Sequence, residues 1–227
     1  MDRPPFELEP KVAAWKQSLA AGGCSLNALT PLKLLYKKNG ELLFALLSAD
    51  ISDPQGRRLP PYIFIRGNAC IVVVRITNQD SGEEAFLMMR QRRIGNGWLN
   101  LEFPAGMLDR NIDDPASVAL RELAEETGLI IPAEALFPLC DKPLLSSAGA
   151  SDEGVHYFGA CVIVSGKRFN DCKGRSISND EENEHIQLYL CTRQQAEEET
   201  VSLQARLGLY LFSDYVTRLR PIPRLLP

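Results

Sequence analysis

Histidine is nearly absent from this sequence, which contains only His156 and His185. Both lie in strand-like runs of apolar residues, where a histidine is more often a structural residue than a reactive one. The sequence therefore gives no support to a Ser-His-Asp or Cys-His catalytic site. A phosphate-binding loop of the form G-x-x-x-x-G-K-[ST] and a zinc-binding H-E-x-x-H segment are also missing.

Cysteine is present, but without the spacing of a metal site or a disulfide framework. None of the six cysteines belongs to a C-x-x-C pair, and several lie in apolar runs. We therefore expect reduced thiols in a cytoplasmic protein, rather than a zinc site or disulfide bonds. The cysteines are Cys24, Cys70, Cys140, Cys161, Cys172 and Cys191.

Features of a membrane protein or a nucleic-acid binder are lacking as well. No apolar run approaches the roughly 18 residues that a membrane-spanning helix requires. The first residues, MDRPPFELEP, have no basic-then-apolar signal pattern. The formal net charge of −4 opposes electrostatic binding to nucleic acids and to acidic membrane surfaces. We expect neither of them as a partner.

The sequence does contain a succession of strand patterns with a few helices between them. Residues 7–22 are predicted to form a short helix, and Asn39-Gly40 a tight hairpin turn between two apolar strands. A closing amphipathic helix is predicted over residues 201–219, and a polar loop over 166–183. This order of elements predicts an α+β fold, an α/β/α sandwich around a mixed sheet.

The 227 residues suffice for one full core with a modest extension. We predict that residues 1–65 form an N-terminal helix and β module used in dimerisation. Residues 66–227 are predicted to form the main domain.

An acidic helix is the most informative segment of the chain. Asp113 or Asp114 can cap its start, Pro115 suits its first position, and Gly128 is placed to end it. Three of its carboxylates are separated by three and four residues, so they return to one helix face. These are Glu122, Glu125 and Glu126.

Three carboxylates so close together repel one another unless a cation lies among them. A hard divalent cation with oxygen ligands, such as Mg²⁺, would relieve that repulsion. The alternative is a solvated helix face, but such a face usually mixes both charge signs. Here the acid is concentrated beside the loop from Pro104 to Gly106, whose glycine allows a ligand to approach the backbone closely.

The segment from Gly106 to Leu129 resembles the Nudix box. That pattern is a glycine, five residues, a glutamate, seven residues, and then Arg-Glu-aliphatic-x-Glu-Glu-x-Gly-aliphatic. The second half matches at every specified position from Arg121 to Leu129. The first half departs, because six residues follow Gly106 and the acid after them is Asp113. The resemblance implies the Nudix fold and hydrolysis of a nucleoside diphosphate derivative.

The resemblance also implies a metal site and a catalytic base. In enzymes with this box the carboxylates bind Mg²⁺, or Mn²⁺ in its place, so Glu125 and Glu126 are implied to act in catalysis. The segment from Asp180 to Ile186 resembles a loop of bacterial ADP-ribose pyrophosphatases that supplies the base, here Glu182. A solvated charge run is the alternative interpretation. The implied metal ligands are Glu122, Glu125, Glu126, Glu184 and the carbonyl of Ala105.

Substrate-binding residues are predicted on both sides of the box. Arg90 and Arg93 stand at a strand end just upstream, and the guanidinium fork matches the geometry of phosphate oxygens. The resemblance favours Arg93, since related enzymes often place an arginine there. Gly106 is implied to contact the substrate. Glu153 ends a segment that resembles the Ser-Pro-Gly-x-x-x-Glu loop of nucleoside diphosphate-sugar hydrolases, with Ala148 replacing the proline.

The similarity extends over roughly residues 30–220 to plant-type ADP-sugar diphosphatases, through LEFPAGMLD with its elongated box loop and through QARLGLYLF. It implies Mg²⁺-dependent hydrolysis of a nucleoside diphosphate sugar, ADP-glucose or ADP-ribose, to AMP and a sugar phosphate by a homodimer. One alternative is a Nudix hydrolase of UDP-sugars or dinucleoside polyphosphates. Another is a non-catalytic Nudix protein that senses a nucleotide sugar.

Overall fold

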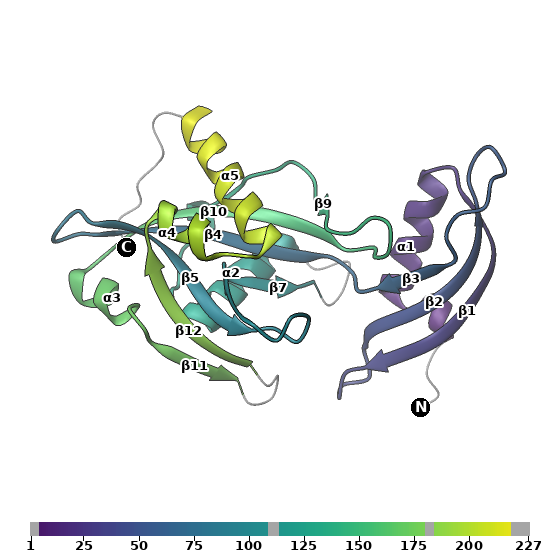
Figure 1. Cartoon of the computed structure of the whole chain (residues 1–227), viewed down its shortest axis with the longest axis horizontal. Helices are drawn as coiled ribbons and strands as arrows, with labels where there is room; N and C mark the ends of the chain where they lie inside the picture. The colour runs from purple at the N-terminus through teal and green to yellow at the C-terminus, as the bar shows by residue number, and fades with distance from the viewer. Residues whose placement is uncertain (1–4, 109–113, 180–183, 219–227) are drawn as a thin grey trace. The chain divides into compact units, whose positions relative to one another are not determined.

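The computed structural model describes residues 5–108, 114–179 and 184–218 (Figure 1). The chain divides into two compact units. The first unit consists of Met1–Ala69, Met107–Asp113 and Leu144–Val155, and the second of Cys70–Gly106, Asp114–Pro143 and His156–Pro227. The predicted division at residue 65 into two domains stays a prediction.

The first unit contains an antiparallel sheet in the order β1 (Ser25–Tyr36), β2 (Leu42–Ser52), β3 (Tyr62–Ile65). Helix α1 (Pro10–Ala21) follows a short 3-10 turn, η1 (Phe6–Leu8), and packs on one face of this sheet. Side chains alternate between the two faces of a strand, so every second residue of β2 is buried against α1. The buried residues of this core are Val12, Trp15, Leu42, Ala45, Leu47, Ala49, Ile51 and Ile65.

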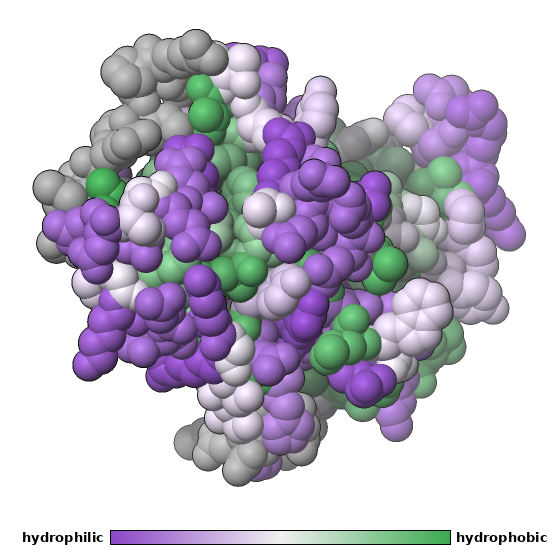
Figure 2. Space-filling view, turned by 60° about the vertical axis from the view of Figure 1, so that its left-hand side comes forward, coloured by the Kyte–Doolittle hydropathy of each residue, from purple (hydrophilic) through white to green (hydrophobic). Residues whose placement is uncertain are grey.

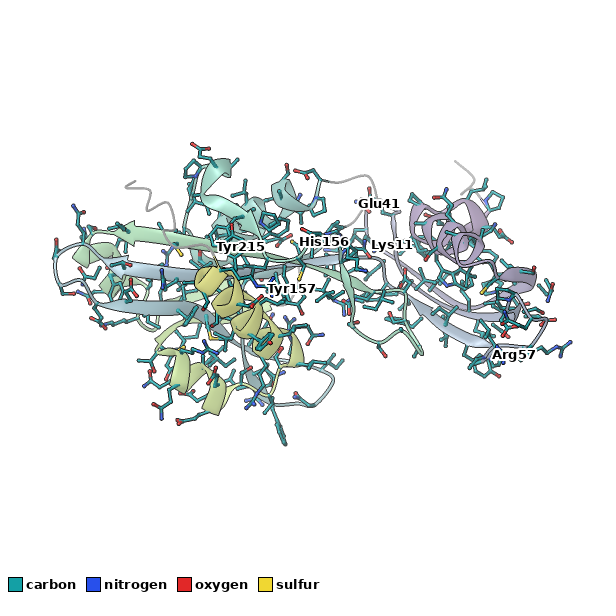
Figure 3. The ribbon with its side chains drawn as sticks, turned by 90° about the horizontal axis from the view of Figure 1, so that it is seen from above. Lys11, Glu41, Arg57, His156, Tyr157 and Tyr215 are labelled. Atoms are coloured by element: carbon teal, nitrogen blue, oxygen red, sulfur yellow. The ribbon has the colours of Figure 1, made fainter. Side chains whose placement is uncertain are left out.

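The predicted hairpin turn is confirmed. Gly40 has a φ of 89°, which glycine adopts without steric cost, and it ends the turn between β1 and β2. The first strand is longer than its apolar pattern indicated, because pairing with β2 begins at Ser25. Lys11 is buried beside this sheet, and its Nζ donates a hydrogen bond to the carbonyl of Leu43 at 3.1 Å (Figure 3).

The second unit is built on a mixed sheet. Its main path runs β11-β12-β5-β4-β10-β8, with β6 paired to β5 and β7 paired to β4. Two-residue β9 (Leu144–Leu145), which belongs to the first unit, pairs with the first residues of β10. The strands are β4 (Ala69–Asn78), β5 (Glu84–Arg92), β6 (Leu99–Glu102), β7 (Ala105–Met107), β8 (Leu136–Pro138), β10 (Gly154–Val164), β11 (Ser176–Asn179) and β12 (Glu184–Cys191).

Helices α2 (Pro115–Thr127) and α5 (Leu203–Arg218) cover opposite faces of this sheet. Cys70 and Val73 are three residues apart on β4, so their side chains face opposite sides. Cys70 lies beside the Gly106 backbone and near the charges of the α2 glutamates. Val73 lies against α5, where a Cβ added to Gly208 would be 2.9 Å from its Cγ2. The predicted α/β/α arrangement is confirmed (Figure 1).

Aromatic packing fixes α5 on its face of the sheet. Tyr215 projects from α5 (Figure 3) and stacks on Phe137 with ring centroids 4.5 Å apart. Phe212, one turn earlier, contacts Phe86 of β5 edge to face at 5.6 Å. The predicted closing helix over residues 201–219 is thus confirmed, with α5 ending at Arg218 among the described residues.

The prediction of a polar loop over residues 166–183 is wrong in part. This stretch contains α3 (Gly166–Asp171) and the edge strand β11, and a further short helix, α4 (Arg193–Glu199), follows β12. A 3-10 turn, η2 (Ala133–Ala135), precedes β8. These elements are too short to show a recognisable period in the sequence.

Figure 2 shows a face on which hydrophilic residues predominate and hydrophobic residues appear in small groups. Among the helices described, none combines the length and the apolar character needed to cross a membrane.

Candidate functional site

Helix α2 is held at both ends as the sequence predicts. Asp114 is the N-cap: its Oδ2 accepts hydrogen bonds from the Ser117 backbone N at 3.1 Å and from the Ser117 hydroxyl at 2.8 Å. The bonds from Ser117 lower the pKa of Asp114. Pro115 occupies the first turn, and Gly128 ends the helix with a φ of 68°. These capping residues fix the two ends of α2 and therefore the positions of its glutamates.

The three predicted carboxylates of α2 have different surroundings. Glu125 is exposed, Glu122 is partly buried, and Glu126 is only 8% exposed. The buried side of the helix consists of Val118, Ala119, Leu123, Glu126 and Thr127. An acidic face turned wholly away from the packed face is therefore not what the structure shows. Glu126 lies on the packed side of the helix, and its burial requires hydrogen bonds or a cation to offset the lost hydration.

Strand β7, whose first two residues the sequence predicts as part of a loop, contacts two of these glutamates through Ala105 and Gly106. Glu126 Oε2 accepts a hydrogen bond from the backbone N of Ala105 at 2.9 Å. A Cβ built on Gly106 would lie 2.2 Å from Cγ and 2.4 Å from Oε1 of Glu122, so no larger residue fits there while Glu122 keeps this rotamer. Glu122 Oε1 also accepts from Arg121 Nη2 at 3.2 Å. The Ala105–Gly106 backbone and the carboxylates of Glu122 and Glu126 thus adjoin one another.

Cys70 of β4 lies under this strand. Its thiol is fully buried, and burial raises its pKa to about 12, with the charges of Glu122 and Glu126 adding to the effect. The thiol is therefore protonated at neutral pH and acts as a small apolar side chain beneath the carboxylates.

A polar cluster lies at the end of β5, on the same face of the sheet as Cys70. Val74 of β4 is directly opposite Leu87 of β5, and alternation from Leu87 leads to Met89 and Gln91. Directly opposite these on β6 stand Glu102 and Asn100. This is the face covered by α2.

Arg93 is anchored within this cluster. Its Nε and Nη2 both donate to Oε2 of Glu102, at 3.1 and 2.8 Å. Asn100 Nδ2 donates to the other oxygen of Glu102 at 3.2 Å, and Asn96 Nδ2 donates to Asn100 Oδ1 at 3.0 Å. Gln91 is 6% exposed, and within the described part of the chain its Oε1 has no hydrogen-bond partner.

Arg90 lies on the opposite face of β5. Its Nη2 bonds Glu199 Oε2 at 2.6 Å, and its guanidinium stacks 3.8 Å above the ring of Tyr189. The Tyr189 hydroxyl donates to the other oxygen of Glu199 at 2.9 Å, so the three side chains form a closed group. The hydrogen bond from Arg90 lowers the pKa of Glu199. The substrate role predicted for Arg90 stays a prediction, but this geometry gives it a structural role.

Glu153 belongs to the first unit and is also held by neighbours. Its side chain pairs with Arg66 Nε at 2.9 Å and accepts from Ser146 Oγ at 2.5 Å. Asp152 beside it accepts from the backbone N atoms of Arg66 and Gly67, although burial raises its pKa. The predicted contact of Glu153 with substrate stays a prediction.

Three further residues that the sequence singled out have side chains that are not described. Glu182 and the box acid Asp113 lie outside the described residues. Glu184 is described only as the first residue of β12, where it is opposite Asn179 and two residues before Ile186. Ile186 is directly opposite Gln91 of β5, so β12 starts next to the polar cluster of β5 and β6.

The donor chemistry of the α2 site fits a hard divalent cation. The carboxylates of Glu122 and Glu126 adjoin the Ala105–Gly106 backbone, where the absence of a Cβ at Gly106 leaves room for Glu122. The role predicted for the Ala105 carbonyl as a metal ligand stays a prediction. Within the described residues, no group of three or more histidine, cysteine, aspartate or glutamate side chains is arranged to hold a metal ion. A full ligand set therefore requires Glu184, the substrate or water in addition.

A separate cavity of about 370 Å³ lies on the α5 face and contains none of the predicted site residues. Phe86 and Phe212 form its apolar wall, and Arg75 and Arg193 its charged rim together with Glu84. It is remote in the fold from the carboxylates, because they face the α2 side of the sheet.

Sequence reasoning missed Glu102 and Asn100. Asn100 and Glu102 alternate with leucines in a short strand next to the box, and that pattern was the available signal. Their importance depends on the β5–β6 register, which brings them beside Gln91 and Arg93. A sequence pattern alone does not give that register.

The chain is similar to several known proteins. It is 27% identical over 177 residues to Nudix hydrolase 14, chloroplastic, of Arabidopsis thaliana, a match that covers 74% of this chain and 57% of that protein. It is 35% identical over 80 residues to CMP-5'-(N-acetyl-N-hydroxy-3-aminopropyl)phosphonate hydrolase of Streptomyces rubellomurinus, covering 35% and 36% of the two chains. The chain thus spans little more than half of the first relative's length and about a third of the second's.

A solved structure also shares the fold. The crystal structure of an ADP compounds hydrolase aligns with a TM-score of 0.53 and 16% sequence identity, covering 87% of this chain and 99% of that one. The NUDIX domain family matches residues 68–209, which is more than half of the chain and includes the whole box and both sheet faces described above. The chain belongs to the Nudix family.

Proposed function

We propose that this chain hydrolyses the diphosphate bond of an ADP-sugar, ADP-glucose or ADP-ribose, to AMP and a sugar phosphate, with Mg²⁺ as cofactor. The observation that carries the proposal is the contact of Glu122 and Glu126 with the Ala105–Gly106 backbone of β7. Two acidic side chains held against one short strand form the start of an oxygen-ligand site for a divalent cation. Nudix hydrolases generally use such cations.

Each residue has a defined part in the proposed reaction. Glu122, Glu126 and the Ala105 carbonyl would hold Mg²⁺, with Glu125 and Glu184 as the further predicted ligands. The bound cation neutralises diphosphate charge and lowers the pKa of a water molecule. Mn²⁺ is expected to replace Mg²⁺, because it accepts the same oxygen ligands.

The remaining chemistry belongs to other side chains. Glu182 is proposed to remove a proton from the attacking water, whose oxygen bonds to one phosphorus as the bridging P–O bond breaks. Arg93 is proposed to contact the phosphate that leaves and to stabilise its charge. Hydrolysis consumes one water molecule and yields two phosphate monoesters, AMP and the sugar phosphate.

The choice of an adenine nucleotide is supported by similarity alone. The solved structure with this fold is described as an ADP compounds hydrolase, at an identity that supports only the fold. The elongated loop after Gly106 is the residue pattern that the chain shares with plant-type ADP-sugar diphosphatases. A different base is the main alternative, because one relative is named a hydrolase of a CMP-linked phosphonate.

A substrate panel tests the proposal. ADP-glucose, ADP-ribose, UDP-glucose, CDP-choline and diadenosine polyphosphate are incubated with the protein and Mg²⁺, and products are separated by ion-exchange chromatography. The highest kcat/KM is expected for an ADP-sugar. A higher value for UDP-glucose or CDP-choline would contradict the adenine assignment. Binding of ADP-glucose without any product would instead favour a non-catalytic sensor.

A homodimer is also part of the proposal. The face of the β1–β3 sheet that α1 does not cover carries exposed apolar side chains, including Leu35, Leu46, Tyr62 and Phe64. A sheet face of this kind requires cover, and a second copy of the chain would supply it. Light scattering after size exclusion should give twice the chain mass of 25.2 kDa. Elution at the monomer mass would contradict dimerisation.

We also propose a reducing compartment, the cytoplasm. None of the six cysteines forms a disulfide in the structure, and three of them are buried. Secreted proteins of this size usually oxidise such thiols to disulfides.

A further inference from the structure

Arg93 does not stand alone at the end of β5, because its guanidinium is clamped by a neighbouring acid. We propose that Glu102 is a positioning residue, which fixes the guanidinium of Arg93 in the orientation that binds a substrate phosphate. The inference rests on the proposed function, in which Arg93 contacts that phosphate. Glu102 itself has no assigned contact with the substrate.

The geometry of the clamp supports a positioning role. Two nitrogens of Arg93, Nε and Nη2, converge on Oε2 of Glu102, so the plane of the guanidinium is fixed as well as its distance. The other oxygen of Glu102 is occupied by Asn100, and Asn100 is bonded in turn by Asn96. The carboxylate is thus held through both oxygens, and it in turn restricts the orientation of the Arg93 guanidinium.

The burial of the pair makes the clamp effective. The side chain of Glu102 is 16% exposed and that of Arg93 is 39% exposed. Water screens a half-buried ion pair less than a surface pair, and the guanidinium retains an exposed edge. Arginine has several rotatable bonds, so holding it before the substrate arrives reduces the entropy lost on binding.

The surroundings also indicate that the polar cluster of Gln91, Arg93, Asn100 and Glu102 binds a ligand. It lies on the α2 face of the sheet, with the Ala105–Gly106 backbone and the glutamates. Gln91, directly opposite Asn100, is nearly fully buried, and among the described residues its Oε1 has no donor. A buried acceptor without a donor is unfavourable in a purely structural network. A ligand hydroxyl or a bound water would supply one.

Removing the charge of Glu102 distinguishes a role in positioning Arg93 from a role in neutralising its charge. If Glu102 only reduced the positive charge of Arg93, removing its charge would strengthen phosphate binding and lower KM. If Glu102 positions Arg93, the same change weakens phosphate binding and raises KM. The two roles therefore predict opposite signs in one measurement.

Steady-state kinetics with ADP-glucose and Mg²⁺ test the inference. The values of kcat and KM are measured for Glu102→Gln, for Arg93→Gln and for the double variant. We expect Glu102→Gln to lower kcat/KM about tenfold, mainly through KM, as when a charge-assisted hydrogen bond is weakened. The double variant should be no worse than Arg93→Gln alone, since Glu102 acts only through Arg93. Losses that multiply, or a lowered KM in Glu102→Gln, would overturn the inference.

Glu199→Gln is the matched control. It removes the partner of Arg90, a β5 residue that has no part in the proposed reaction. This ion pair lies on the opposite face of the sheet, with side-chain exposures of 31% for Arg90 and 37% for Glu199. This variant should keep the wild-type KM and kcat. An equal loss in Glu199→Gln would mean that the Glu102 effect reflects general loosening of β5, and the positioning role would be refuted.

A measurement without turnover separates this inference from the proposed function. The Nε–H group of Arg93 should give a slowly exchanging ¹H–¹⁵N NMR signal, assigned by its absence in Arg93→Gln. Glu102→Gln should shift or broaden that signal, whereas Glu199→Gln should leave it unchanged. An unchanged signal in Glu102→Gln refutes the clamp. An intact clamp in a protein that cleaves no nucleoside diphosphate would refute the proposed function instead.

Discussion

Gly106→Ala is predicted to push Glu122 away from the strand that carries the candidate site. The added Cβ would lie 2.2 Å from Cγ, 2.3 Å from Cδ and 2.4 Å from Oε1 of Glu122. Carbon atoms not bonded to one another do not approach so closely, so the glutamate must take another rotamer. The φ of Gly106 is not in the positive region, and the backbone itself therefore accepts alanine.

The magnitude follows from the same contact. Overpacking of this kind typically costs about 1–3 kcal/mol, and the lower entropy of the unfolded alanine chain offsets about 0.4–1 kcal/mol of it. A net loss of about 1–2 kcal/mol corresponds to a Tm lower by about 2–8 °C for a chain of this length. Because Glu122 is a proposed metal ligand and this change displaces it, Mg²⁺-dependent hydrolysis should fall by about 10- to 100-fold.

Thermal unfolding followed by circular dichroism, together with an assay of ADP-glucose hydrolysis, measures both effects. Gly95→Ala is the stability control, since an added Cβ there meets nothing within 4 Å. The double variant Gly106→Ala/Glu122→Ala removes the clash and should be no less stable than Glu122→Ala. If the double variant loses the stability of both single changes in full, the Gly106–Glu122 contact is not the cause.

The remaining predictions concern the α2 helix and pH. Glu126→Gln should fold normally, because an amide oxygen can still accept from Ala105, yet lose Mg²⁺-dependent turnover by orders of magnitude; near-normal activity would refute the metal assignment. Asp114→Ala should lower the free energy of unfolding by about 1 kcal/mol at pH 7. The pKa of Asp114 is lowered on folding, so the wild type should lose this contribution as pH falls through its folded pKa, and urea unfolding at pH 7 and pH 3 measures that loss. Burial lowers the pKa of His156 below its ordinary 6.5, so unfolding takes up a proton and the free energy of unfolding declines as pH falls below about 6.5. In urea titrations His156→Gln should reduce that decline, and an unchanged pH dependence would contradict it.

The parts of the fold that depend on local signals were predictable from the sequence. The cap at Asp114, the end of α2 at Gly128 and the turn at Gly40 each rest on the chemistry of one or two residues. Long strand patterns were equally readable, because alternate or continuous apolar residues mark them over many positions. The order of these elements then predicted the α/β/α arrangement, which the family resemblance also implied.

The parts that depend on distant residues were not predictable. The sequence does not reveal that Glu126 is buried while Glu125 is exposed, since that difference comes from Ala105 of β7 packing on the helix. The clamp on Arg93 depends on the register between β5 and β6. Likewise, the residue types do not distinguish Arg90 from Arg93. The family resemblance favours Arg93, and the structure separates the two arginines by the face of the sheet on which each lies.

The central claim is that the site formed by Glu122, Glu126 and the Ala105–Gly106 backbone cleaves a diphosphate. ³¹P NMR of ADP-glucose with the protein and Mg²⁺ tests it most directly. The account predicts that both diphosphate signals disappear and two phosphate-monoester signals replace them, and that Glu126→Gln abolishes this conversion. Diphosphate signals that persist with the wild-type protein, or equal conversion by Glu126→Gln, would contradict it.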